Sequence, residues 1–229
     1  MASLDCRSPL PAITLDEFLG HRLESLGDQV RLRPGAHGNG SINVFESFLL
    51  ALLVRMIKPT AIIEIGTFRG GTTGHLFHNA PPDAIIYTLD LPADVRPCGI
   101  TDSGLAATKT RDFLPDSPRV KLRLVDTSTW DGTLDTRVQF AFIDGNHSYN
   151  GVRNDTEKVL SLLDEVGCVC WHDCLGRDYG YGVHRYLLEL RSRGLRIFRV
   201  KGVHEVSSLA MWMTQACEQR VGLTLRADI

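Results

Sequence analysis

Five short apolar runs in this sequence each end in residues that could bind a ligand or move a proton. Carboxylates accept hydrogen bonds and hold cations, glycines let a ligand approach the backbone, and histidine exchanges a proton near neutral pH. In an open parallel sheet the carboxyl ends of the strands share one edge, where ligands bind. We therefore expect one site built from Glu64 with the turn at 66–73, Asp90, Asp126 with Thr127, Asp144, and His172 with Asp173.

The turn after the first run contains Gly66, Thr67, Phe68, Gly70 and Gly71. A dinucleotide-binding turn has glycine at the position of Phe68, because the backbone there must approach a pyrophosphate. A phenylalanine ring blocks that approach, whereas the first glycine still permits a sharp turn and the last two permit close passage of a ligand or helix. The turn therefore favours a nucleoside ligand without a pyrophosphate over NAD.

Asp90 ends the second run, and Asp126 follows the third. Beside the glycine turn, Asp90 could accept hydrogen bonds from both hydroxyl groups of a ribose; the competing interpretation is a solvated helix cap. Asp126, followed by Thr127, could accept a hydrogen bond from an adenine amino group, but Asp-Thr-Ser is also a good N-cap sequence. We expect all three residues in a nucleoside site, with capping as the alternative.

The elements that must position these residues follow an α/β pattern. Short β-branched runs alternate with amphipathic segments, which is typical of βαβ units and a parallel sheet covered on both faces. We expect residues 1–58 to form an N-terminal helical extension or lid, with helices at 14–27 and 41–58, on a domain spanning 59–229. Within that domain the predicted strands are 61–65, 85–89, 120–125, 138–143, 166–171, 195–200 and 208–213, and the clearest helices are 149–163 and 183–193.

Composition limits the partners and the compartment. The chain has 229 residues and a formal net charge of -2, which suits one large domain and argues against nucleic acid as an obligatory partner, since phosphate binding needs a basic face. The N-terminus lacks the basic start and apolar core of a signal peptide, and no apolar run approaches a membrane span in length. We expect a cytoplasmic protein with no membrane partner, whose six cysteines are reduced.

Three blocks resemble class I S-adenosylmethionine-dependent methyltransferases, in the branch of metal-dependent sugar and macrolide O-methyltransferases and cephalosporin-hydroxylase-like proteins. They are 64–73 (EIGTFRGGTT), 142–149 (FIDGNHSY) and 171–174 (WHDC). The resemblance implies a Rossmann-like, doubly wound seven-stranded sheet, mostly parallel with a reversed last strand. It also implies S-adenosylmethionine as cofactor, with Gly66 and its neighbours on the methionine portion, Asp90 on the ribose, and Mg²⁺ at the positions of Asp144 and Asp173.

The pairing of Asp144 with Asp173 can also be argued from strand geometry. Adjacent parallel strands lie about 4.8 Å apart, so carboxylates at both ends converge, and a hard cation offsets their repulsion. The competing interpretation has Asp144 orient the cofactor or cap a helix, and Asp173 bond to backbone. Cys174 departs from the family pattern, because many relatives carry a carboxylate or amide there and thiol is a poor Mg²⁺ ligand, which leaves sparse coordination or a softer metal. The cysteine spacing at 168–174 does not favour zinc.

The general base is a second point of departure. Many relatives carry aspartate at the position of Asn146, and asparagine cannot take a proton. His147 stands three residues after Asp144, where some macrolide methyltransferases carry a catalytic histidine, and an ordinary pKa of about 6.5 suits removal of a hydroxyl proton. We expect His147 as the base with His172 in reserve; a structural histidine is the alternative for each.

These features predict methyl transfer from S-adenosylmethionine to an oxygen of a small hydroxylated molecule, of natural-product or sugar type, with Mg²⁺ assistance. One rival is a different enzyme, hydroxylase-like or NAD-linked, on the same fold. Another is a non-catalytic or accessory cofactor-binding protein, which Asn146 and Cys174 keep open. Loops at 33–39 and 177–184 are candidates for substrate contact or for ordinary surface loops, and the helix at 41–58 could serve a homo-oligomer contact.

Overall fold

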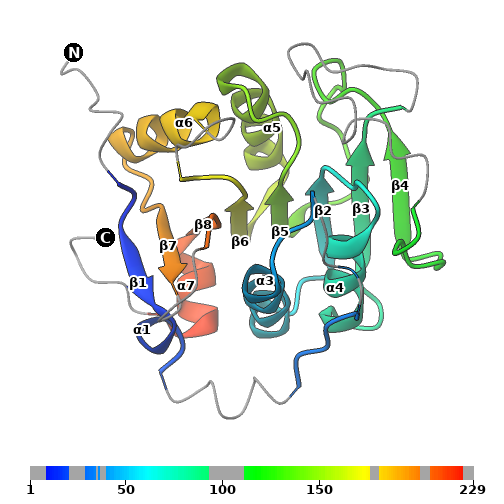
Figure 1. The fold of residues 1–229 in the computed structure, drawn as a ribbon, viewed down its shortest axis with the longest axis horizontal. Helices are drawn as coiled ribbons and strands as arrows, with labels where there is room; N and C mark the ends of the chain where they lie inside the picture. Colours follow the sequence, from blue (N-terminus) through cyan, green and yellow to red (C-terminus); the bar gives the residue numbers. More distant parts are fainter. Residues whose placement is uncertain are drawn as a thin grey trace.

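The computed structural model describes residues 9–20, 29–34, 36, 40–92, 111–175, 181–201 and 207–223. Over these ranges the chain forms one eight-stranded sheet in the order β1-β7-β8-β6-β5-β2-β3-β4 (Figure 1). The strands are β1 Ala12–Thr14, β2 Ala61–Ile65, β3 Ile85–Asp90, β4 Val120–Leu124, β5 Val138–Ile143, β6 Leu163–Trp171, β7 Phe198–Lys201 and β8 Ala210–Met213. The helices are α1 Leu15–Leu19, α3 Val44–Ile57, α4 Gly71–Asn79, α5 Tyr149–Leu162, α6 Tyr181–Ser192 and α7 Gln215–Val221.

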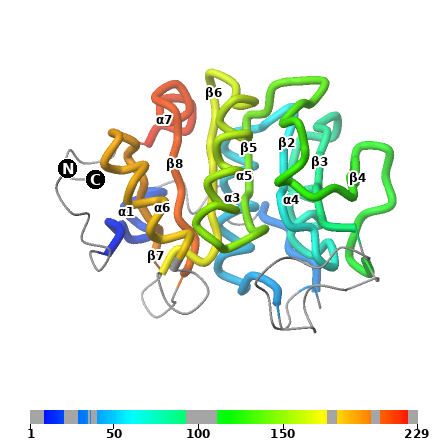
Figure 2. The backbone as a smooth tube through the Cα atoms, turned by 90° about the horizontal axis from the view of Figure 1, so that it is seen from above, coloured from blue at the N-terminus to red at the C-terminus, as the bar shows by residue number. Residues whose placement is uncertain are grey.

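The sheet is parallel except at β8, which runs antiparallel to both of its neighbours, β6 and β7. Figure 2 shows the same order from above, with β4 at one edge of the sheet and β7 towards the other. The predicted doubly wound α/β architecture with a reversed last strand is confirmed. The strand count is eight rather than seven, because residues 12–14 add β1 beside β7. A run of three residues whose last member is already a helix cap is too short for a period-two pattern to reveal.

The strands place alternate side chains in two cores, one on each face of the sheet. On one face, Ile62 and Phe140 pack with α1, α3, α4 and α7. On the other face, Ile63 and Trp171 pack with α5 and α6. Helix α3 is apolar at every position from 49 to 54, and all of these side chains are buried, because α3 lies against the sheet with α4 and α7 at its sides. The candidate site lies at the carboxyl ends of the central strands, between these two helix layers.

The helices begin and end at sequence signals. Asn43 caps α3 in a capping box with Glu46, and the helix ends at Lys58 in the left-handed region, just before a proline. Thr14 caps α1, and Ser148 caps α5 by accepting a hydrogen bond from Gly151 N. The predicted helix at 41–58 is confirmed with a start at 44. The helix predicted at 14–27 is seen as α1, but it ends at Leu19 with Gly20 as its cap and is therefore shorter than predicted; residues 21–27 lie outside the described ranges.

Two further expectations stay open. The division into residues 1–58 and 59–229 remains a prediction; β1 and α3, both from the first segment, lie in the sheet and in the core of the same fold. The loops predicted at 33–39 and 177–184 fall partly outside the described ranges; of the second, residues 181–184 are not loop but the first turn of α6. Among the helices that the structure describes, none combines the length and the apolar character needed to cross a membrane.

Candidate active site

The centre of the site is the point where strand order reverses. Neighbouring parallel strands β2 and β5 end side by side there, with β3 and β4 beyond one and β6 beyond the other. Asp144 N donates to Ile65 O at 2.8 Å, and Gly66 N donates to Leu89 O at 2.8 Å, so the two loops leave the sheet together. Open α/β sheets bind ligands at such a reversal.

The glycine turn after β2 is packed tightly between two other loops. Gly66 has φ +96°, and a Cβ placed on it would lie 2.2 Å from Asp144 O. Gly70 has φ +83°, and a Cβ there would lie 2.6 Å from the backbone of Leu114. Phe68 adopts φ 48°, which is unusual for a large side chain and is the kind of backbone strain that clusters at functional sites.

Glu64, the last polar side chain before the turn, is fully buried in a hydroxyl network. Its Oε2 accepts hydrogen bonds from the hydroxyls of Thr73 and Thr88, each at 2.5 Å, and Thr88 also bonds to Thr67 Oγ1 at 2.6 Å. Its Oε1 has no hydrogen-bond partner within the described part of the chain. Burial raises the pKa of Glu64 to about 8 despite those hydroxyls, so the side chain carries a proton at neutral pH. A buried oxygen without a partner is rare and fits a site completed by a ligand.

Asp90 ends β3 beside the glycine turn, as expected, and its carboxylate is already engaged. Arg111 donates to its Oδ2 at 3.0 Å, and Leu91 N donates to its Oδ1 at 3.0 Å. Burial raises the pKa of Asp90, an effect that Arg111 opposes. A ribose at this carboxylate would therefore share it with a guanidinium that the sequence analysis did not identify.

Asp126 and Thr127 follow β4 and have local partners. Asp126 Oδ1 accepts from Ser128 N at 2.8 Å, which closes a turn; no helix begins in the described stretch between β4 and β5, so Asp126 is not the helix cap of the alternative interpretation. The carbonyl of Thr127 accepts from Asn154 Nδ2 at 3.0 Å and Lys158 Nζ at 2.5 Å. An adenine contact at either residue remains a prediction.

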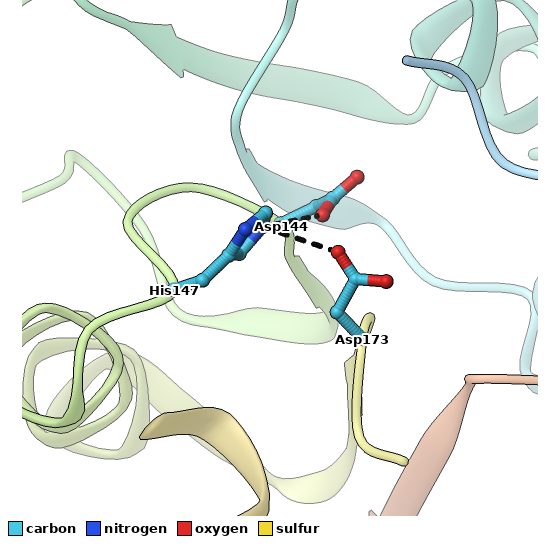
Figure 3. A group of neighbouring side chains, drawn as sticks. All are labelled: Asp144, His147 and Asp173. Atoms are coloured by element: carbon cyan, nitrogen blue, oxygen red, sulfur yellow. Dashed lines mark hydrogen bonds and ion pairs between the residues drawn. The ribbon is translucent and has the colours of Figure 1, made fainter. Parts of the chain in front are cut away.

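Asp144, His147 and Asp173 converge at the ends of β5 and β6. His147 Nε2 lies 3.3 Å from Asp144 Oδ1 and 3.5 Å from Asp173 Oδ2, and Figure 3 shows the ring directed at both carboxylates. One ligand atom from each of the three residues lies within 4.8 Å of the others. The two aspartates come together because Ile143 and Trp171, just before the two loops, are paired in register. Two carboxylates and one imidazole at this spacing can hold a divalent cation.

The charges in this cluster shift one another's protonation. Burial alone would raise the pKa of Asp144, but the neighbouring His172 and His147 outweigh it and lower that pKa to about 2. Burial opposes the charged form of His147, yet Asp144 and Asp173 raise its pKa overall. The carboxylate of Asp144 is therefore ionised at neutral pH, as a cation ligand must be.

His172 is held by carboxylates at both ring nitrogens. Its Nδ1 lies 3.2 Å from Asp144 Oδ1, and its Nε2 lies 3.2 Å from Glu46 Oε2. Burial favours the neutral ring, but Asp144, Asp173 and Glu46 raise the pKa of His172 well above its usual range. A ring that keeps its proton is a poor acceptor for another, so this geometry favours His147 over His172 as a base.

Asn146 and Cys174, the two residues that depart from the family pattern, both pack against neighbouring parts of the fold. Asn146 Oδ1 accepts from Ser148 N at 2.9 Å, and a Cβ added to Gly151 would lie 2.5 Å from Asn146, so Asn146 packs under the start of α5. Cys174 is buried, and burial raises the pKa of its thiol to about 12. It is outside the cluster of Asp144, His147 and Asp173. Cys168, Cys170 and Cys217 are also buried and free.

Residues 63–174 match a family described as a methyltransferase domain. The chain carries a methyltransferase domain. The matched residues contain the blocks at 64–73, 142–149 and 171–174, and the match confirms the resemblance to class I S-adenosylmethionine-dependent methyltransferases that those blocks indicate.

One curated relative matches a shorter stretch of the methyltransferase. An uncharacterized protein of Sinorhizobium fredii, y4gI, is 35% identical over 69 residues. These are 30% of this chain and only 8% of the relative. The chain thus spans less than a tenth of that relative's length.

Solved methyltransferase structures share the fold at low sequence identity. The O-methyltransferase TomG of Streptomyces achromogenes, involved in tomaymycin synthesis and solved with S-adenosylmethionine, is 18% identical with a TM-score of 0.57; the match covers 88% of this chain and 99% of TomG. An O-methyltransferase of Bacillus cereus, solved with S-adenosylhomocysteine, is 19% identical with a TM-score of 0.55, covering 89% and 93%. An rRNA methylase of Streptococcus thermophilus is 14% identical with a TM-score of 0.51, covering 78% and 99%. The fold alone therefore does not name the acceptor.

Three residues that contact the candidate site were not predicted from the sequence: Arg111, Glu46 and Ser208. Arg111 follows a long stretch between the second and third strands that carries no periodic pattern. Glu46 shows only as the third residue of a capping box, and Ser208 only as the start of a predicted strand. No signal in the sequence links positions 46, 172 and 208, because their contacts depend on how α3 and β8 pack against β6.

Proposed function

We propose that this methyltransferase transfers a methyl group from S-adenosylmethionine to an oxygen of a small hydroxylated molecule, with help from a divalent cation. The observation that carries the proposal is the convergence of Asp144, His147 and Asp173 beside the glycine turn, at the reversal of strand order. A sulfonium donor needs a nucleoside site, and an oxygen acceptor needs a base and a means of orientation. Both lie at this one edge of the sheet.

The methyl donor fits the residues that surround the turn. S-adenosylmethionine, when bound, supplies a methyl group on a positively charged sulfur. Asp90, on the strand next to the turn, would accept hydrogen bonds from the ribose hydroxyls and share its carboxylate with Arg111. The methionine end would be lined by the turn from Gly66 to Gly71 and by Glu64, whose Oε1 has no hydrogen-bond partner among the described residues. Asp126 and Thr127 would face the adenine.

The cation fits the donor set after β5 and β6. The carboxylates of Asp144 and Asp173 suit Mg²⁺, and an imidazole as third ligand suits a somewhat softer ion such as Mn²⁺. A divalent cation there would supply orientation of the acceptor and a lower pKa for its hydroxyl. The carboxylate oxygens of Asp144 and Asp173 would be cation ligands, whereas the buried Cys174 would contribute none.

His147 is the proposed general base. Its Nε2 is directed into the site between the two carboxylates, within reach of a hydroxyl proton on an acceptor bound there. The same geometry also fits Nε2 as the third cation ligand. The two roles separate in His147→Gln: loss of a base lowers the rate and changes the pH profile at unchanged cation affinity, whereas loss of a ligand raises the dissociation constant of the cation.

The remaining partners follow from charge and thiol chemistry. A net charge of -2 favours a small-molecule acceptor over nucleic acid. Four buried free thiols favour a reducing compartment such as the cytoplasm. The exposed Val44 at the start of α3, 56% accessible, leaves room for a homo-oligomer contact on that helix.

The direct test is transfer of isotope-labelled methyl groups from S-adenosylmethionine to a panel of phenols, sugars and polyketide-type alcohols. We expect product from at least one acceptor class, loss of product on addition of a chelator, and recovery with Mg²⁺ or Mn²⁺. Asp144→Asn should abolish the recovery, whereas Asp131→Asn, an exposed aspartate beyond β4, should not. Binding of S-adenosylmethionine without transfer to any acceptor would instead support the non-catalytic alternative.

A further inference from the structure

Glu46 lies in helix α3, distant in the sequence from the cluster of Asp144, His147 and Asp173. Its carboxylate nevertheless contacts His172, the residue next to Asp173. Its carboxylate is only 1% exposed. Oε1 accepts from Ser208 N at 2.7 Å and from Ser208 Oγ at 2.9 Å. Oε2 accepts from Asn43 N at 3.1 Å and lies 3.2 Å from His172 Nε2. The carboxylate thus joins the start of α3 to the loop after β6 and to the segment before β8.

The contact with His172 fixes the direction of an imidazole that touches both aspartates of the cluster. With Nε2 held by Glu46, Nδ1 faces Asp144 Oδ1 at 3.2 Å and Asp173 Oδ1 at 3.6 Å. Ser208 Oγ lies 3.1 Å from the same Nε2 and holds that end of the ring as well. Asp144 Oδ1 thereby meets two imidazoles, while within the described residues no hydrogen bond reaches its Oδ2.

Capping alone does not account for the burial of this carboxylate. The chain contains a second capping box at α1, in which Glu17 makes the same contact with the backbone of Thr14 from an exposed position. Withdrawing a carboxylate from water is costly, so a buried one is stabilised only by several matched donors. Glu46 has those donors, and one of them, His172, is the direct neighbour of the cation ligands.

We propose that Glu46 is a positioning residue for the divalent cation: it fixes the ring of His172, which holds Asp144 and Asp173 in the arrangement that receives the ion. This inference rests on the proposed function. Partners that orient a ligand typically change metal affinity by about 10- to 100-fold when they are removed. Ser208 belongs to the same support, because it holds the other oxygen of Glu46.

Glu46→Gln is the sharpest perturbation because it keeps the shape of the side chain. The contacts to Asn43 N and Ser208 N come from backbone donors, one on each oxygen of Glu46. A glutamine has one carbonyl oxygen and one amide group, so the amide must face a donor on one side. The ring of His172 then loses its fixed acceptor or turns away from Asp144. Glu17→Gln is the matched control, with the same substitution at the same position of a capping box remote from the cluster.

The test is a titration of Mn²⁺, followed by electron paramagnetic resonance, into the full chain and its variants. We expect the dissociation constant of Mn²⁺ to rise about 10-fold or more in Glu46→Gln and to stay within about twofold in Glu17→Gln. The dissociation constant of S-adenosylmethionine, measured with chelator present, should stay within about twofold in both, since Glu46 does not contact the glycine turn. Glu46→Asp, which keeps the charge but shortens the reach to His172, should weaken Mn²⁺ binding to a lesser degree, and it decides the question if Glu46→Gln does not fold.

Three results would count against the inference. Wild-type affinity for Mn²⁺ in a folded Glu46→Gln or Glu46→Asp variant would overturn it while leaving the proposed function intact. Equal weakening of Mn²⁺ and S-adenosylmethionine binding would assign Glu46 a general structural role instead. A wild-type chain that binds no divalent cation would overturn both the cation-assisted function and this inference.

Discussion

Gly66→Ala is the substitution whose effect is best determined by the structure. The residue has φ +96°, and a Cβ there would lie 2.2 Å from the carbonyl oxygen and 2.7 Å from the carbonyl carbon of Asp144. Both are backbone atoms, so no side-chain rotation can relieve the contact. The neighbouring hydrogen bond from Asp144 N to Ile65 O would have to shift to make room.

Gly194→Ala isolates the backbone component of that cost. Gly194 has φ +100°, and nothing lies within 4 Å of its added Cβ. A non-glycine residue in this region costs about 1–2 kcal/mol, so we expect that loss of unfolding free energy for Gly194→Ala. Overpacking adds about 1–3 kcal/mol where neighbours cannot move freely, so Gly66→Ala should lose about 2–5 kcal/mol of unfolding free energy.

The assay is urea unfolding of both variants followed by circular dichroism, with the slope of each transition checked against wild type. If Gly66→Ala folds, it should also bind a divalent cation more weakly, because the displaced carbonyl belongs to Asp144, whose carboxylate is a proposed cation ligand. A loss in Gly66→Ala no larger than that in Gly194→Ala would refute the close packing of the glycine turn against the loop after β5.

Three further predictions concern single side chains. Asp90→Ala should weaken S-adenosylmethionine binding by about 10- to 100-fold, since hydrogen bonds to a charged group are worth about 1.5–3 kcal/mol; calorimetric binding at wild-type affinity would exclude the ribose role. Burial raises the pKa of Glu64 from 4.5 to about 8, so the native state keeps a proton that the unfolded chain has lost. Its contribution to stability is therefore full below pH 4.5 and falls by up to about 1.4 kcal/mol per pH unit towards pH 8; unfolding of Glu64→Gln from pH 5 to 8 should lack this slope, and an unchanged slope would contradict it. His147→Gln should lower the rate of methyl transfer and remove the acidic limb of its pH profile, and an unaltered profile would exclude His147 as the base.

The edge of the sheet that carries the site was predictable because its signals are local. A glycine turn directly after a β-branched run indicates a strand that ends at a ligand site, and Asp90, Asp144 and Asp173 each follow such a run. The register of β5 against β6 then brings the last two together, as adjacent parallel strands require. The reversed strand β8 was expected from the resemblance to the methyltransferases, which the two late apolar runs fit.

The supporting contacts were not predictable because they join distant parts of the chain. Glu46 and His172 are 126 positions apart, and their contact depends on how α3 packs on the sheet. Arg111 reaches Asp90 from a stretch whose composition has no periodic signal. β1 was missed because three residues carry too little alternation, although the edge of the sheet accepts them as a parallel strand.

Calorimetric titration of S-adenosylmethionine into the wild-type chain, with and without Mg²⁺, tests the central claim most directly. The account predicts saturable binding of one molecule per chain, competed by S-adenosylhomocysteine, with no comparable binding of NAD because Phe68 occupies the position where a pyrophosphate would pass. Absence of binding in both buffers, or tighter binding of NAD, would contradict it.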